Sequence, residues 1–156
     1  MAIAPTLATC LKQAGIQPEI LSHPHTPSAS RTAQATHVSG DRVAKAVLLK
    51  DETGYLLAVL PASHHLRLDA VEVLTGRSLT LAAEEEIGRT FPDCEVGAVP
   101  PVGTAYGLPA VVDDSLVKEP EIYLEGGDHT TLVRVTREDF AQLMQGAQAG
   151  VLSLHQ

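Results

Sequence analysis

The stretch Val43-Ala44-Lys45-Ala46-Val47-Leu48-Leu49 decides the fold, because a short apolar run bounded by turn residues is typical of a buried β-strand. Residues 51–54, Asp-Glu-Thr-Gly, follow as a hairpin turn, and residues 55–60 form the expected partner strand. Lys45 interrupts the apolar pattern. Its ammonium must stay near water or meet an anion, so we expect it at the lip of a pocket, although a lysine at a strand edge can also serve only to discourage sheet pairing.

Apolar spacing and capping signals predict further elements on both sides of this hairpin. Helices are expected at residues 6–14, 30–37, 68–74 and 83–89, and a last one after Thr136. Ser30, Asp69 and Thr136 are the expected caps of three of them. Strands are expected at residues 19–21, 78–81, 110–113, 121–124 and 131–135. Because helices and strands do not alternate regularly, the pattern predicts an α+β fold with a mixed sheet, as one domain over residues 1–156.

The bulk composition excludes several classes of protein. A formal net charge of −8 argues against a protein that grips duplex DNA, because phosphate contacts dominate that affinity. Aromatic residues make up 3% of the chain, too few to predict an RNA-stacking surface. No apolar run is long enough for a membrane helix and no signal peptide is evident, so the cytoplasm is expected. Cys10 and Cys94 form no CxxC motif and are expected to be structural.

Two glycine segments suggest what Lys45 serves. Gly97-Ala98-Val99-Pro100-Pro101-Val102-Gly103 lies in a long predicted loop, and Glu125-Gly126-Gly127-Asp128-His129 lies between two predicted strands. A fixed lysine beside glycine loops with free N–H groups can hold a phosphate or a developing oxyanion. The alternatives are a structural turn stiffened by the two prolines and an ordinary hairpin turn.

With these motifs placed in order, the chain resembles the YbaK-type aminoacyl-tRNA deacylases, which are similar to the editing domain of bacterial prolyl-tRNA synthetases. The matching segments are residues 43–49, 58–64, 97–103 and 126–129. The resemblance implies a mixed, partly closed sheet surrounded by helices. It also implies hydrolysis of a mischarged tRNA, in particular tRNA(Pro) carrying Ala, Cys or Ser, without a cofactor. Ala46 and the Gly-Gly-Asp-His context differ from some relatives and leave the acyl group open.

The resemblance also implies the site residues. Lys45 matches the family's active-site lysine, and the candidates for catalysis are Lys45, Gly97, Gly103, Gly127 and His129. The candidates for substrate binding are Ser28, Thr32, Ser63, His64, Pro100, Pro101, Gly126 and Asp128. For the hydroxyl residues the alternative is helix capping, and His129 is equally a general base, a ribose contact or a solvated turn residue.

The expected partner is the acylated 3′ end of a tRNA, with a synthetase as a candidate for delivering it. No metal site is expected, because no acidic residue or cysteine completes a ligand set with His23 and His25 or with His64 and His65 at helical spacing. The alternative function is a non-catalytic module that binds a nucleotide or an aminoacyl ligand in the same pocket.

Overall fold

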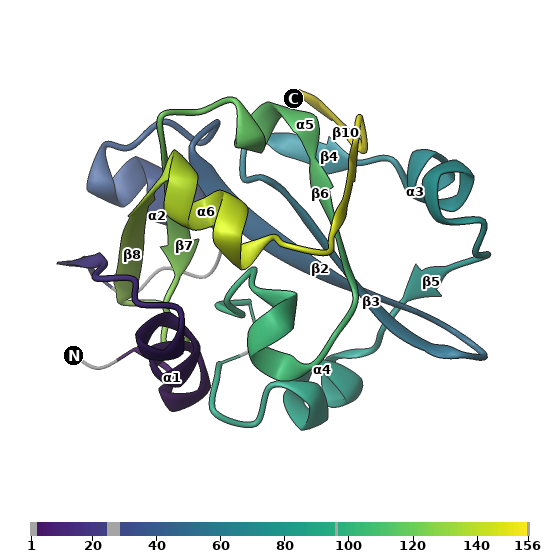
Figure 1. Ribbon diagram of the computed structural model, residues 1–156, viewed down its shortest axis with the longest axis horizontal. Helices are drawn as coiled ribbons and strands as arrows, with labels where there is room; N and C mark the ends of the chain where they lie inside the picture. The colour runs from purple at the N-terminus through teal and green to yellow at the C-terminus, as the bar shows by residue number, and fades with distance from the viewer. Residues whose placement is uncertain (1–2, 25–28, 96, 156) are drawn as a thin grey trace.

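The antiparallel hairpin of β2 (Val43–Asp51) and β3 (Gly54–Pro61) lies at the centre of the computed structural model, which describes residues 3–24, 29–95 and 97–155 (Figure 1). Its register runs from Ala44 opposite Pro61 to Asp51 opposite Gly54. Both faces of β3 are buried, because Leu57 and Val59 join one apolar cluster while Leu56 and Ala58 join another. The sequence therefore predicted the central hairpin correctly.

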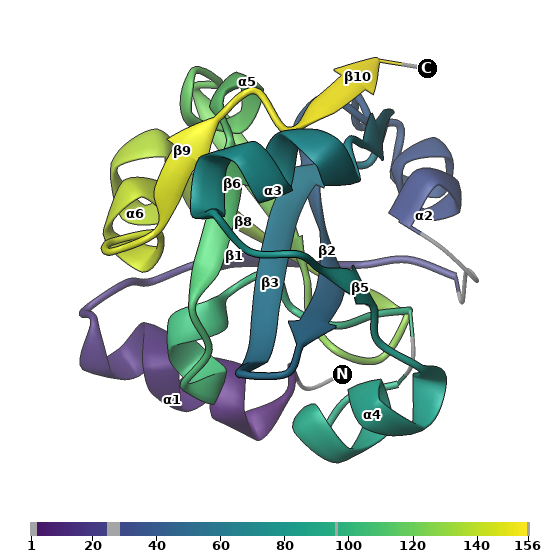
Figure 2. The same ribbon diagram turned by 90° about the vertical axis from the view of Figure 1, so that its right-hand side faces the viewer.

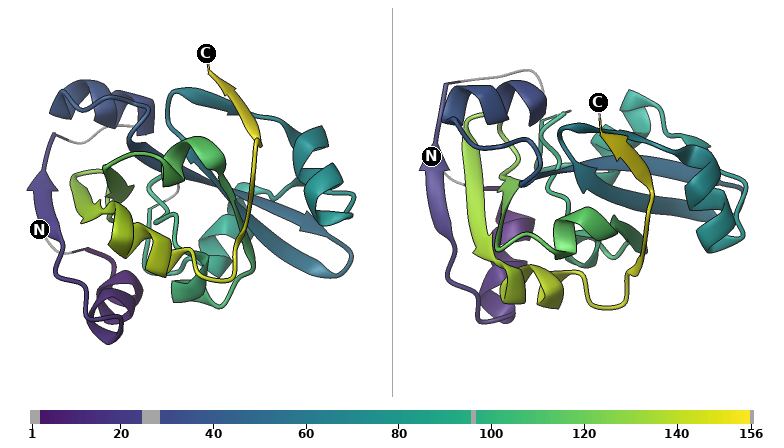
Figure 3. Two further views of the ribbon diagram at one scale, coloured as in Figure 1. Left: turned by 45° about the horizontal axis from the view of Figure 1, so that its top comes forward. Right: turned by 90° about the horizontal axis from the view of Figure 1, so that it is seen from above.

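The strands on either side of this hairpin build a mixed sheet. Its order is β1 (Glu19–Ser22), β8 (Thr131–Thr136), β7 (Glu121–Glu125), β2, β3, β6 (Ala110–Asp113) and β9 (Gln148–Gly150). The β2–β7, β3–β6 and β6–β9 pairs are parallel, and the other pairs along this path are antiparallel. Seen from above, β1 and β8 run across the direction of the central hairpin, so the sheet is strongly curled (Figure 3). This arrangement confirms the predicted α+β fold with a mixed, partly closed sheet.

The edge of β2 that faces away from β3 is shared by two partners. Near its start, Val43 and Ala44 pair with β7, and near its end Leu49 and Lys50 pair with the short strand β5 (Thr80–Leu81). Between these two pairings, residues 45–48 have no ladder partner on that side among the described residues. The sheet therefore forks directly at Lys45.

Helices cover both faces of the sheet. They are α1 (Pro5–Gln13), α2 (Ala29–Thr36), α3 (Leu68–Thr75), α4 (Glu84–Thr90), α5 (Asp114–Val117) and α6 (Arg137–Leu143), with a 3₁₀ turn η1 (Gly103–Tyr106). Helix α3 crosses in front of β3 in Figure 2, where its Val71 packs into the cluster of Leu56 and Ala58. Phe140 of α6 and Leu116 of α5 pack on the other side with Leu57. Within the described residues, no helix is both long enough and apolar enough to cross a bilayer.

The predicted caps have different outcomes. The Thr136 hydroxyl accepts a hydrogen bond from the Asp139 N–H at 3.1 Å, as expected of a cap. Ser30 was wrongly predicted as a cap, because α2 already begins at Ala29. Asp69 was also wrong: α3 begins after Arg67 without a side-chain cap, and Asp69 pairs with the Arg67 guanidinium at 2.8 Å.

Short elements escaped prediction. The missed ones are α5, β9 and the two-stranded ribbon of β4 (His64–Leu66) and β10 (Ser153–His155). Each has three or four residues, too few for a hydrophobic period to show. Tertiary pairing therefore defines these elements.

Candidate functional site

A cavity of about 300 Å³ opens where the sheet forks. Its walls come from β2, β3, β5, α4, the loop after α4 and the end of β7. Most of the lining is apolar and includes Leu48, Leu57, Ile87, Phe91 and Val99. Among the described lining residues, the ionisable ones are Lys45, Glu84 and Glu125. A largely apolar hollow with a few polar groups is the usual form of a small-ligand site.

Lys45 is half-buried at this cavity. Its ammonium donates a hydrogen bond to the His64 carbonyl at 2.7 Å and lies 3.5 Å from the Ala62 carbonyl. Burial lowers the pKa of Lys45 from its ordinary value. An ammonium has three N–H donors, so these contacts orient Lys45 and leave one donor for a ligand.

Glu125 is the functional candidate that sequence reasoning missed. In the parallel register of β2 and β7, Ala44 lies opposite Leu124, so Glu125 is the next residue beside Lys45. Its side chain is 1% exposed, and burial raises the pKa of this carboxyl to about 7, against smaller opposing effects of Thr32 and His129. Neither carboxylate oxygen meets hydrogen-bond geometry with a described residue. A buried carboxyl at a cavity, with a pKa near neutrality, is suited to proton transfer.

The backbone of Ala46 also faces the fork. The carbonyls of Arg42 and Leu48 accept bonds from Tyr123 and Ala82 on this side of β2. Backbone groups of alternate residues point to the same side of a strand, so the N–H and C=O of Ala46 point into the gap. This N–H is therefore a candidate donor to a negatively charged oxygen in the cavity.

The first glycine loop is divided between the cavity and the core. Gly97, with φ of +89°, lines the cavity together with Val99. Pro100 and Pro101 are buried and do not line it. Gly103 lies elsewhere, at the start of η1, where an added Cβ would stand 2.8 Å from the Leu108 carbonyl. The structure thus brings only the beginning of this loop to Lys45.

The second glycine turn ties distant segments together. The Gly126 carbonyl accepts a bond from the Ala4 N–H at 2.7 Å, and the Gly127 carbonyl accepts one from the Glu95 N–H at 2.8 Å. The Gly126 N–H donates to the Thr131 carbonyl and is therefore engaged. Asp128 accepts bonds from Thr130 N–H and the Thr131 hydroxyl, which lower its pKa although burial alone would raise it. These contacts connect the turn to the loop that carries Gly97.

His129 follows in the left-handed region, with φ of +62°, and is 5% exposed. It does not line the cavity, but its ring lies near enough to lower the pKa of Glu125. Its burial removes the alternative of a solvated turn residue. A positive φ at a non-glycine residue costs conformational free energy, and the contacts of the surrounding turn must offset it.

Gly127→Ala is expected to destabilise the fold by roughly 1–3 kcal/mol. Gly127 has φ of +114°, and a Cβ there would lie 2.9 Å from the Ala4 Cβ and 3.3 Å from the Cys94 Sγ. Gly146→Ala is the matched control, because Gly146 also has positive φ but open space around it. Urea unfolding of both variants measures the difference. Equal stability losses would show that the close packing at Gly127 is unimportant.

The remaining candidates lie around the cavity without lining it. Thr32 is fully buried on α2 and lies close enough to Glu125 to affect its pKa. His64 reaches the site through its carbonyl, which holds Lys45. Ser63 lines a separate groove between α2 and the β3–β4 turn. Ser28 lies outside the described residues.

A family model of the aminoacyl-tRNA editing domain matches residues 23–143, which include the fork, Lys45 and both glycine turns. The chain belongs to the aminoacyl-tRNA editing domain family. No curated protein matches it.

Solved structures of editing-domain shape agree with this assignment. A candidate trans-editing enzyme for prolyl-tRNA synthetase superposes with a TM-score of 0.85 at 29% identity, covering 97% of this chain and 96% of its own. A scaffold protein used for computational epitope grafting matches with a TM-score of 0.85 at 27% identity, covering 97% of both chains. A hypothetical protein at 24% identity shares the fold, with a TM-score of 0.84 and coverage of 96% and 99%.

A cysteine can serve as a nucleophile in enzymes, so Cys94, which lies near the second glycine turn, is a candidate to consider. Cys94 is unsuited to this role, because burial raises the pKa of its thiol to about 12. Its Sγ instead lies 3.1 Å from the Tyr106 hydroxyl, which donates to Asp93 at 2.9 Å. Cys94 is therefore not a candidate nucleophile, and the candidates for chemistry are the polar groups at the fork.

Proposed function

We propose that this protein is a trans-acting deacylase that hydrolyses the ester between a wrong amino acid and the 3′ end of a tRNA. The observation that carries the proposal is the meeting of Lys45, Glu125 and the Ala46 backbone at one apolar cavity. Family membership supports the deacylase role. Similarity to a candidate trans-editing enzyme for prolyl-tRNA synthetase supports tRNA(Pro) as the first tRNA to test. Ala, Cys and Ser are the first acyl groups to test, because the resemblance of the sequence implies small ones.

The proposed reaction uses water as the nucleophile. Glu125, in its ionised form, takes a proton from a water whose oxygen attacks the ester carbonyl carbon. The carbonyl oxygen becomes an oxyanion that the Ala46 N–H stabilises, while Lys45 anchors the terminal nucleotide of the tRNA. When the intermediate collapses, the bond to the ribose oxygen breaks, and protonated Glu125 returns the proton to that oxygen. The products are a free amino acid and a tRNA with a free 3′ end.

The apolar lining selects the acyl group by size. A cavity of about 300 Å³ that must also admit the ribose leaves space for a small side chain. One methylene in such a pocket changes the transition-state energy by only ~1–3 kcal/mol. The protein is therefore expected to act on several small amino acids with graded rates.

A panel of charged tRNAs tests this proposal. We expect turnover of tRNA(Pro) carrying at least one of Ala, Cys and Ser, and at least ~10-fold slower hydrolysis of Pro-tRNA(Pro). The measurement is release of labelled amino acid under single-turnover conditions, corrected for spontaneous hydrolysis. A parallel series with prolyl-tRNA synthetase added asks whether that synthetase delivers the substrate.

The panel also separates the deacylase from a binding module. Saturable binding of mischarged tRNA without turnover of any member would make this protein a non-catalytic module. Repeating the binding at several salt concentrations adds a second measure, because contact limited to the 3′ end predicts a shallow dependence of affinity on salt.

A further inference from the structure

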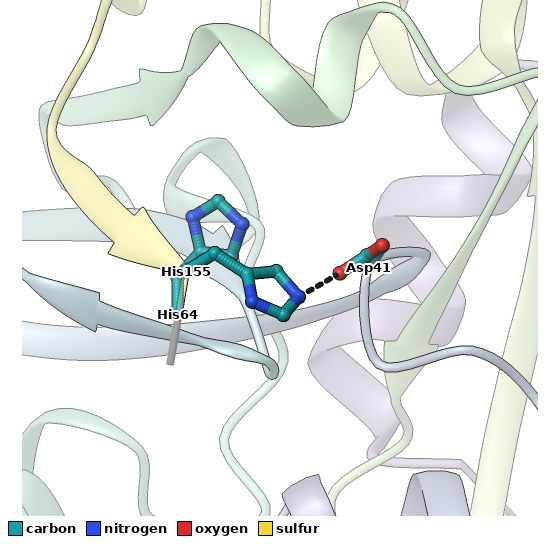
Figure 4. A group of neighbouring side chains, drawn as sticks. All are labelled: Asp41, His64 and His155. Atoms are coloured by element: carbon teal, nitrogen blue, oxygen red, sulfur yellow. Dashed lines mark ion pairs between the residues drawn. The ribbon is translucent and has the colours of Figure 1, made fainter.

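Three side chains from distant segments meet beside the β4–β10 ribbon. They are Asp41, from the turn before β2, His64 on β4 and His155 on β10, and one ligand atom of each lies within 4.8 Å of the others (Figure 4). The His155 Nε2 lies 3.1 Å from the Asp41 Oδ1. The two rings are 5.3 Å apart between centroids and nearly perpendicular. None of the three residues lines the cavity at the fork.

The backbone holds the two histidines together. His64 and His155 are directly opposite each other in the antiparallel register of β4 and β10. Residues directly opposite in such a pair project to the same face, with Cβ atoms ~5 Å apart. The two imidazoles are thus placed by strand pairing.

Buried groups fix the His64 ring. Its Nδ1 lies 2.8 Å from the Ser153 hydroxyl, which donates to the Asp113 carboxylate at 3.1 Å. Because that hydroxyl gives its proton to Asp113, it accepts one from Nδ1, and in the neutral imidazole the Nε2 of His64 then carries the lone pair. Ser153 and Asp113 are 4% and 3% exposed, so these hydrogen bonds from His64 through Ser153 to Asp113 lie in the core. Outer partners of this kind orient histidine ligands at metal sites.

A neighbouring hydroxyl also orients the Asp41 carboxylate. The Ser63 hydroxyl donates a hydrogen bond to its Oδ1. This bond orients the carboxylate, and an aspartate is ordinarily an anionic oxygen ligand at neutral pH.

We propose that Asp41, His64 and His155 bind a divalent transition-metal ion, for which Zn²⁺ is the best match. Two imidazoles and one carboxylate suit zinc, whereas Mg²⁺ and Ca²⁺ prefer oxygen ligands alone. Zinc bonds of ~2.0–2.1 Å require ligand atoms about 3.3 Å apart in a tetrahedron. The His155 side chain is 61% exposed and can turn to close the present spacing. Water fills the fourth position.

The ion would fasten β10 and the turn before β2 to β4. His64 would bind the ion through its ring, while its backbone carbonyl accepts the hydrogen bond from Lys45. The metal site is therefore linked to the cavity through the backbone of His64. The proposal does not depend on the deacylase activity, and no step of the hydrolysis passes through the ion. This proposal differs from the sequence-based expectation of no metal site. That expectation rested on histidines that are neighbours in the sequence and did not include Asp41 or His155.

Titration of the full chain with Zn²⁺ alone, followed by calorimetry and by competition with a chromogenic chelator, tests the site. We expect one tight site per chain, and a loss of affinity of about a hundredfold or more in His155→Ala and in Asp41→Asn. His65→Ala is the matched control, because His65 is the next residue on β4 and pairs with Leu154 instead. It is expected to bind as the unmodified chain does.

A thermal shift gives a second measure that does not depend on calorimetry or on a competing chelator. Zn²⁺ is expected to raise the melting temperature of the unmodified chain and of His65→Ala, and not that of His155→Ala. His155 is exposed, so its replacement should leave the fold intact, which circular dichroism verifies. Weak binding without defined stoichiometry, or equal affinity of His155→Ala and the unmodified chain, would overturn the proposal.

Discussion

Replacing Lys45 with alanine is expected to lower kcat/KM for a mischarged tRNA by about a hundredfold or more while the protein remains folded. The Lys45 ammonium is half-buried at the cavity and is oriented by the His64 carbonyl, so it meets a substrate oxygen without further ordering. Folding should tolerate the change, since the variant removes a partly desolvated charge. Single-turnover hydrolysis and urea unfolding measure the two effects.

Lys50→Ala is the matched control for this variant. Lys50 lies on the same strand, but its ammonium pairs with Glu86 at 2.7 Å and does not line the cavity. Removal of either lysine changes the net charge equally, so only a specific contact makes Lys45 different. If both variants deacylate at the same rate, Lys45 is a strand-edge lysine and the proposed anchoring is wrong. A rise in KM with unchanged kcat would support anchoring over stabilisation of the transition state.

The central hairpin could be predicted because its signals are local. An apolar run, a turn of Asp, Glu, Thr and Gly, and a second apolar run lie within 20 residues, and the pairing of Val43–Asp51 with Gly54–Pro61 needs no distant partner. The Thr136 cap is local in the same sense. Ser30 and Asp69 show the limit of such signals, because either a neighbouring residue or an earlier helix start can displace a plausible cap.

The fork and Glu125 could not be predicted from spacing. Glu125 is 80 residues after Lys45 in the sequence, and only the β2–β7 register makes them neighbours. In the sequence, Glu125 stands at the head of a glycine turn, where a solvated carboxylate is expected. A buried carboxyl becomes visible only once the packing around it is known, because its burial comes from elements on all sides.

The glycine motifs were recognised, but their role in the structure is broader than donating N–H groups. Gly97 reaches the cavity, whereas Gly126 and Gly127 use their carbonyls to hold residue 4 and residue 95. Close approach, which a Cβ would obstruct, explains glycine at position 127. The sequence thus identified the right segments, while packing decides which of their atoms face the cavity.

Glu125→Gln is expected to lower the deacylation rate by about a hundredfold or more, because a glutamine cannot take a proton from water. The pKa of Glu125 is raised to about 7 by burial, so the base is ionised only as the pH rises through that value. The rate of the unmodified protein should therefore increase from pH 5 through about pH 7, where half of the base is ionised, and level off above about pH 8, after spontaneous hydrolysis is subtracted. The variant's residual rate should lack this increase.

Glu84→Gln is the control for the loss of a carboxylate at the cavity. Glu84 lines the same cavity from the start of α4 but is exposed, so it is expected to keep both the rate and the pH profile. If Glu125 instead bound the ammonium of the aminoacyl group, Glu125→Gln would raise KM and leave the shape of the kcat profile unchanged. The separation of kcat from KM therefore decides between these two roles.

Glu125→Gln is expected to lower the deacylation rate but to raise the stability of the fold at neutral and higher pH, because burial of the ionised carboxylate destabilises the folded state. The pKa of Glu125 is raised from 4.5 to about 7 on folding, so its contribution favours the folded state most at low pH and is lost as the pH rises through about 7. Between pH 5 and pH 8 this single group should lower the free energy of unfolding by roughly 2–3 kcal/mol. Glu125→Gln has no such titration, so urea unfolding at the two pH values should show a smaller decrease for the variant, by about that amount. Parallel pH dependences of the two proteins would mean that this carboxyl titrates normally, and the proposed base would then lose its physical basis.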